Sequence, residues 1–227
     1  MRRAIAAAGL ALAVCAQLRA HDVSTTPITW NREISRIFYQ RCVSCHRPGG
    51  TSFSLVTYQD VQPRAVAIRD AVLSRRMPPW GAVKGFGDFR NDEALTAEQI
   101  ELITDWVQDD TPKGNNPRML PKMPAFGPSP AVIAPADAVR LVDTLTLKSP
   151  MLLDGLLPQQ AVEGAQIVAT LPDGRVEPLL WLYGYSDRFR HPFLLRKPLP
   201  LPAGTIIRGV KPPASVLLLP ASSSGTH

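Results

Sequence analysis

The sequence has few cysteines and histidines, the residues that form disulfide bonds and bind metal ions. Its 227 residues include three cysteines, four histidines and 7% aromatic residues. Three cysteines exclude a scaffold held by several disulfide bonds. The histidines form no His-x-His pair of the kind that would supply two ligands to one metal ion. Beyond the first twenty residues, no stretch is long and apolar enough to span a bilayer, which needs about 20 residues.

The first twenty residues have the pattern of a secretory signal peptide. Arg2 and Arg3 form a positive start, residues 4–16 form an apolar run, and Ala20 provides a small residue at the cleavage site. The run is too short for a transmembrane anchor. We therefore predict a signal peptide over residues 1–20, a mature chain beginning at His21, a periplasmic or otherwise exported location, and no transmembrane segment in the mature protein.

The basic charge of the chain is partly a property of this leader. The chain has 25 basic and 19 acidic side chains, a net charge of +6, and loss of the three arginines at positions 2, 3 and 19 lowers it by three to +3. A net charge this small gives no reason to expect a nucleic-acid partner.

The two cysteines of the mature chain lie in one motif, Cys42-Val43-Ser44-Cys45-His46. C-x-x-C-H is the attachment signature of c-type haem. The two thiols, one turn apart, reach the two vinyl groups of one macrocycle, and the histidine lies under the iron. A disulfide or a redox C-x-x-C pair is the alternative. Cys15 suggests a lipoprotein alternative, although Val14 before it fits a lipobox poorly.

The second axial ligand is predicted to be a methionine, because a second histidine would have to come from a terminus or from the distant His191. Met77 lies in Arg76-Met77-Pro78-Pro79-Trp80, where two prolines stiffen the backbone. Trp80 could then pack on the macrocycle, and Pro48 turns the chain along the haem edge after the motif. The alternative is a core methionine beside a turn. The other methionines considered are Met119, Met123 and Met151.

Three helices are expected in residues 21–116. Asn31 is a candidate N-cap for a helix that leads into Cys42, and Pro63 suits the first turn of a second helix. Residues 96–99 form a capping box before a third helix. Helices before the motif and at the end of this region predict an all-α class I cytochrome c-like domain.

Residues 117–135 contain six prolines and are expected to form a semi-rigid linker. From residue 136 the apolar period changes to two, and Pro172-Asp173-Gly174-Arg175 is a hairpin turn signal. About six short strands are expected over residues 136–220, followed by a disordered tail over residues 221–227. The predicted fold is therefore α + β in two domains, with an all-α class I cytochrome c-like domain followed by a small antiparallel β-sandwich.

Several segments resemble a bacterial cytochrome c domain of the type often fused ahead of a copper-dependent ascorbate-type monooxygenase module. They are residues 28–34, residues 42–49 around the motif, Arg76-Met77-Pro78-Pro79-Trp80 and residues 95–100. The resemblance covers roughly residues 27–115. It implies a single covalent haem c with His46 and Met77 as axial ligands.

Residues 172–175 and 198–205 faintly resemble the C-terminal lobe of those copper monooxygenases. Where that family carries a histidine pair, this chain reads Asp154-Gly155-Leu156-Leu157. A copper site needs clustered imidazole and thioether ligands. The lobe is therefore expected to lack copper and to dock a partner or cover the haem.

The predicted function is an exported mono-haem electron-transfer protein without enzymatic activity, whose redox partner is a dehydrogenase or oxidase complex. One alternative is a haem-based sensor, if Met77 binds the iron weakly. Another is the remnant of a copper monooxygenase fusion. A copper site that uses His21 as a new N-terminus is the third, and it would need His191 or His227 as a second ligand.

Overall fold

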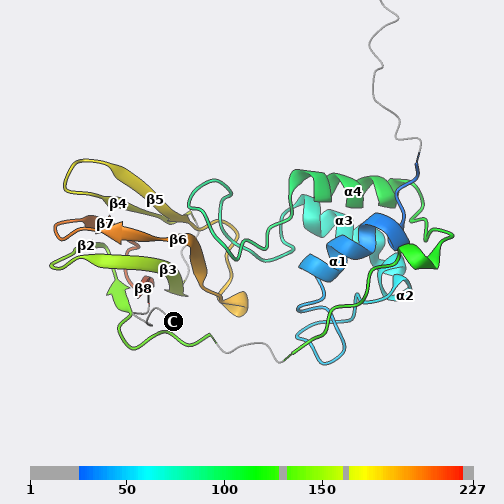
Figure 1. The fold of residues 1–227 in the computed structure, drawn as a ribbon, viewed down its shortest axis with the longest axis horizontal. Helices are drawn as coiled ribbons and strands as arrows, with labels where there is room; N and C mark the ends of the chain where they lie inside the picture. Colours follow the sequence, from blue (N-terminus) through cyan, green and yellow to red (C-terminus); the bar gives the residue numbers. More distant parts are fainter. Residues whose placement is uncertain (1–25, 128–131, 161–163, 222–227) are drawn as a thin grey trace, which may run out of the picture.

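The computed structural model describes residues 26–127, 132–160 and 164–221, and in Figure 1 these form a helical half and a β half. The predicted signal peptide with Cys15, the new N-terminus at His21, and the last six residues lie outside the described residues. In the part of the chain that is described, no helix is long and apolar enough to cross a membrane.

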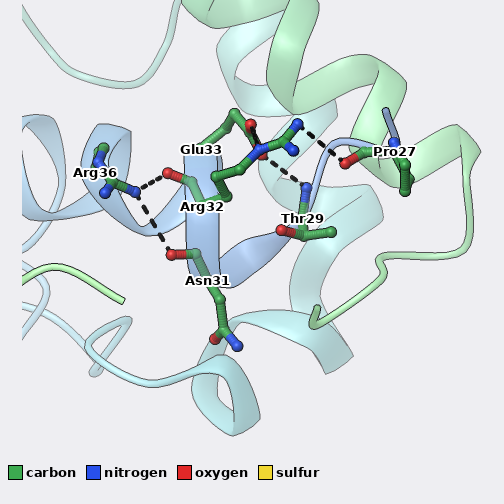
Figure 2. A network of polar contacts seen from close by, with 6 residues as sticks. All are labelled: Pro27, Thr29, Asn31, Arg32, Glu33 and Arg36. Carbon is green, nitrogen blue, oxygen red and sulfur yellow. Dashed lines mark hydrogen bonds and ion pairs between the residues drawn. The ribbon is translucent and has the colours of Figure 1, made fainter. Parts of the chain in front are cut away.

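The helical half begins with a wide turn, Trp30–Ile34, that continues directly into α1 (Ser35–Arg41). Figure 2 shows the polar contacts at this start. The Glu33 carboxylate accepts a hydrogen bond from the Thr29 backbone N–H at 3.0 Å and pairs with Arg32. Arg36 donates back to the Arg32 carbonyl. Of these contacts, the one from Glu33 satisfies a backbone N–H group at the helix start, where N–H groups lack partners within the helix.

The predicted N-cap at Asn31 is wrong, because the extended residue before the first turn is Thr29. Asn31 lies inside the turn and is 6% exposed. Its amide donates to the Gly114 carbonyl at 3.1 Å. The residue therefore joins two segments 83 positions apart.

The remaining helices are α2 (Tyr58–Val61), α3 (Ala65–Leu73) and α4 (Ala97–Gln108). The predicted capping box of the last helix is confirmed, since Thr96 and Gln99 exchange hydrogen bonds of 3.0 and 3.1 Å. Single 3₁₀ turns are formed by Gln62–Arg64, Pro117–Met119 and Asp187–Phe189. The core of this half is apolar and includes Trp30, Ile34, Phe38, Val61, Ile103 and Trp106.

The β half consists of two four-stranded antiparallel sheets, in the orders β1-β8-β3-β6 and β2-β7-β4-β5. The strands are β1 (Val139–Leu141), β2 (Thr144–Thr146), β3 (Met151–Gln160), β4 (Gln166–Thr170), β5 (Val176–Trp181), β6 (Phe193–Leu201), β7 (Ile206–Arg208) and β8 (Ser215–Pro220). Apolar residues of both sheets share one core, for example Leu156 of β3 and Ile207 of β7.

The predicted turn at residues 172–175 joins β4 to β5, and the two strands pair antiparallel. Pro178 in β5 and Pro198 and Pro200 in β6 lie on edge strands, where a missing backbone N–H need not interrupt the sheet. The longest strand, β3, has no period-two pattern in the sequence that would predict it. It is a central strand with a run of buried residues, so it lacks the alternating pattern of a strand exposed on one face.

The predicted fold class, an all-α class I cytochrome c-like domain followed by a small antiparallel β-sandwich, is wrong. The described chain is mostly β, with two antiparallel sheets and only short helices. Trp80 and Phe89, which the prediction assigns to an all-α domain, are buried in the core of the β half. Phe89 also forms a bridge with Leu195. Helical periodicity in short segments does not show where the chain between those segments packs.

Candidate functional site

The C-x-x-C-H motif lies in a tight turn at the end of α1. The Cys42 N–H donates to the Phe38 carbonyl at 2.9 Å, and the Cys45 and His46 N–H groups both donate to the Cys42 carbonyl, at 3.3 and 2.9 Å. Helical geometry therefore continues one turn past α1 and sets the two cysteines one turn apart. Both cysteines are free thiols.

The His46 ring is oriented by one backbone carbonyl. Its Nδ1 lies 3.0 Å from the Phe53 oxygen, so Nδ1 carries the proton and the ring lone pair is at Nε2. Burial lowers the pKa of His46 below its ordinary value, which favours the neutral form. A neutral imidazole whose other nitrogen donates to a carbonyl is the usual arrangement of a metal-ligating histidine.

The loop after the motif closes back on His46. The Leu55 N–H donates to the His46 carbonyl at 3.0 Å, and the Phe53 ring meets the imidazole edge-on at 4.7 Å between centroids. Phe53 is nonetheless 52% exposed. The Arg64 guanidinium carbon lies 5.2 Å from the centroid of this ring, and a single exposed ring of this kind is common on protein surfaces.

Pro48 lies in a turn that follows the motif. The Gly50 N–H donates to the Arg47 carbonyl at 2.9 Å, and Gly49 has a φ of 72°. Proline followed by a residue of positive φ is the pattern of a type II turn. The structure therefore places Pro48 at the exposed edge of the site.

Burial raises the pKa of the Cys42 thiol to about 12. The thiolate is the form that attacks disulfides, and at neutral pH this raised pKa keeps Cys42 in the thiol form.

Met77 lies just beyond the end of α3 and is held there by its backbone, whose N–H donates to the Ala71 carbonyl at 3.2 Å. The side chain is half-buried. Trp80, only three residues further on, does not lie with the helical core. Its indole is 5% exposed in the β core, where it stacks on His191 at 5.0 Å between centroids.

The linker passes beside the motif, a contact that sequence reasoning did not find. The Arg47 guanidinium lies 4.8 Å from the centroid of the Phe126 ring and donates to the Gly127 carbonyl at 2.9 Å. The only sequence signal for this contact is an arginine directly after the motif, which is not specific.

No cluster of three or more metal-binding histidine, cysteine or acidic residues occurs among the described residues. His191, the one histidine of the described β half, has its Nδ1 2.7 Å from the Phe189 carbonyl, and its Nε2 is buried without a hydrogen-bond partner. His21 and His227 lie outside the described residues.

Comparisons with protein-family models, with curated proteins and with solved structures each gave no significant match.

Proposed function

We propose that this chain is an exported mono-haem c-type electron-transfer protein, in which Cys42 and Cys45 attach the haem and His46 and Met77 bind its iron. The observation that carries the proposal is the state of His46. It follows the two thiols directly, its Nδ1 faces the Phe53 carbonyl at 3.0 Å, and its lone pair is free to bind iron.

The residues have separate roles in this proposal. Cys42 and Cys45 would hold the haem through two thioether bonds. Phe53 orients the imidazole through its carbonyl and covers one side of it with its ring. Met77 supplies a thioether sulfur, and a Met/His pair raises the reduction potential of the iron. Bound haem supplies one-electron chemistry, in which the iron alternates between the ferric and ferrous states.

An electron carrier fits this site better than an enzyme does, because the chain itself would supply both proposed iron ligands, His46 and Met77. We propose that the electrons pass to or from a dehydrogenase or oxidase complex, with the β half available for docking.

The experiment uses the full chain, with its leader, in a bacterium that attaches haem to exported proteins. We expect haem to remain on the polypeptide in a denaturing gel, and Cys42→Ser and Cys45→Ser each to reduce that haem strongly. Cys15→Ser is the matched control, since Cys15 is in the predicted leader and should leave haem attachment unchanged.

A wild-type protein without covalent haem would refute the proposal. Equal haem content in the Cys42→Ser variant and the wild type would refute the assignment of that thiol.

A further inference from the structure

The segment between α3 and α4, residues 74–95, is here called the crossing loop. It leaves the helical half after α3, runs to the β half and returns to α4 (Figure 1). Met77 lies near its beginning. The contacts of the crossing loop with the β half therefore bear directly on where the Met77 sulfur is held.

The first of these contacts is the Trp80 side chain. Its indole packs edge-on against the rings of Phe193 and Phe89, at 4.8 and 5.9 Å between centroids, and it stacks on His191 with an interplanar angle of 21°. Phe193 is fully buried in β6. An indole enclosed by aromatic rings on several sides has little freedom to move.

The backbone after Trp80 is fastened to β5 and the residues that follow it. The Val83 N–H donates to the Trp181 carbonyl at 2.9 Å, and the Tyr183 N–H donates to the Gly81 carbonyl at 3.1 Å. At Gly81 the two backbones are so close that a Cβ atom would lie 2.7 Å from the Cα of Tyr185. Only glycine permits this approach.

A second set of contacts with the β half lies further along the crossing loop. The Arg90 N–H donates to the Leu194 carbonyl at 2.9 Å, and the Arg196 N–H donates to the Asp88 carbonyl at 2.8 Å. The Arg90 guanidinium also makes a two-bond pair with the Asp154 carboxylate, at 2.9 and 2.7 Å. The crossing loop is therefore attached to the edge strand β6 and to β3.

Three residues of chain span at most about 11 Å, so Met77 cannot lie far from the buried indole of Trp80. On its other side, the Met77 backbone is bonded to Ala71 of α3. Met77 therefore lies between two fixed points, α3 of the helical half and Trp80 in the core of the β half.

We propose that the β half holds the second iron ligand, Met77, in place, with Gly81 and Phe193 as positioning residues for its sulfur. This inference rests on the proposed function, because it needs a haem for Met77 to bind. It assigns to the β half a role in the haem site itself: the attachment of the crossing loop to the β core would keep the Met77 sulfur where it could bind the iron.

The test compares two glycines of the crossing loop in the haem-loaded, full-length protein. Gly81 and Gly85 both have positive φ, 68° and 84°, so alanine strains the backbone similarly at each. Only at position 81 would the added Cβ meet backbone of the β half, and at Gly85 nothing lies within 4 Å. The measurements are the far-red absorption band of the iron–methionine bond and the affinity of the ferrous protein for carbon monoxide.

We expect Gly81→Ala to lose most of the far-red band and to bind carbon monoxide at least about tenfold more tightly, because apparent affinity follows the open fraction. Gly85→Ala should match the wild type in both. Phe193→Leu removes the ring nearest Trp80 without altering the crossing loop. It should weaken the far-red band and tighten carbon monoxide binding, as Gly81→Ala does, and it is the deciding variant if Gly81→Ala does not fold.

The inference is overturned, while the proposed function stands, if the wild type shows the far-red band and Gly81→Ala keeps both that band and the wild-type affinity for carbon monoxide. Phe193→Leu takes the place of Gly81→Ala in this comparison if Gly81→Ala does not fold. It is also overturned if Gly85→Ala loses the band to the same extent. A wild type that lacks covalent haem, or that binds haem without the far-red band, overturns the Met77 assignment of the proposed function and the inference together.

Discussion

Two loops carry the proposed iron ligands, and they are held in different ways. The loop after His46 closes on its own half, through the Phe53 carbonyl and the backbone bond from Leu55. The crossing loop with Met77 reaches the other half and is fastened there through Trp80 and Arg90. The His46 side should therefore depend on the helical half alone, whereas the Met77 side should depend on both halves.

Of the variants that test this difference between the two loops, Trp80→Ala should have the largest effect. Removing a side chain that is 5% exposed from an aromatic core should lower the free energy of unfolding of the β half by about 3–5 kcal/mol. Denaturant titration followed by circular dichroism measures it. Tyr183→Ala is the control, since Tyr183 is 65% exposed and should change the stability by no more than about 0.5 kcal/mol. Similar losses in the two variants would contradict the placement of Trp80.

A smaller effect, confined to the helical half, is expected from Thr96→Ala. The Thr96 hydroxyl accepts the Gln99 N–H at 3.1 Å, and loss of such a cap costs about 1 kcal/mol. Thr104→Ala is the matched control in the same helix, because the Thr104 hydroxyl only donates back to the Ile100 carbonyl, a contact that adds little to helix stability. Thermal unfolding of both variants tests the difference, and equal midpoints would contradict the capping assignment.

The ion pair between the crossing loop and β3 should contribute less than the cap. The Arg90 and Asp154 side chains are 40% and 25% exposed, so we expect Asp154→Asn to cost at most about 1 kcal/mol. Asp88→Asn should cost less, because the Asp88 side chain that pairs with Arg196 is 72% exposed. Denaturant titrations at low and high salt measure both, and a larger loss at Asp88 would contradict the ranking.

The smallest effect concerns pH and the His46 side. Partial burial tends to raise the pKa of Asp60, but hydrogen bonds from Ser54 and Thr57 outweigh it and hold the pKa below its ordinary value of 3.8. The unfolded chain therefore takes up this proton at higher pH than the folded chain does. The stabilisation is complete above the unfolded value and is lost as the pH falls through the folded value.

Asp60→Asn should make the free energy of unfolding less dependent on pH between about 5 and about 3. Unfolding titrations of the wild type and the variant at several pH values give this dependence. Identical curves would show that the Asp60 carboxylate does not stabilise the loop beside Phe53.

Local features of the fold could be predicted, and long-range ones could not. The capping box at Thr96 and the turn at residues 172–175 are complete within four residues of sequence, and both are present in the structure. The role of Asn31 depends on Gly114, and the position of Trp80 depends on Phe193, partners that no local pattern reveals. For the same reason, the α + β division at the linker missed the crossing of residues 74–95.

The candidate site likewise has a part that could be predicted from the sequence and a part that could not. The order of Cys42, Cys45 and His46 is a motif visible in the sequence, and the structure adds the Phe53 carbonyl that sets the ring tautomer. Met77 as the second ligand remains a prediction. Its support by the β half could not be predicted, because it depends on how two distant segments pack.

The most direct test of the central claim is the absorption spectrum of the purified full-length protein, recorded oxidised, reduced, and reduced under carbon monoxide. A covalent haem bound by His46 and Met77 predicts the weak far-red band in the oxidised state and only weak binding of carbon monoxide to the reduced protein. A haem without that band, with carbon monoxide bound to the reduced iron, would contradict the claim and would indicate a ligand-binding sensor instead.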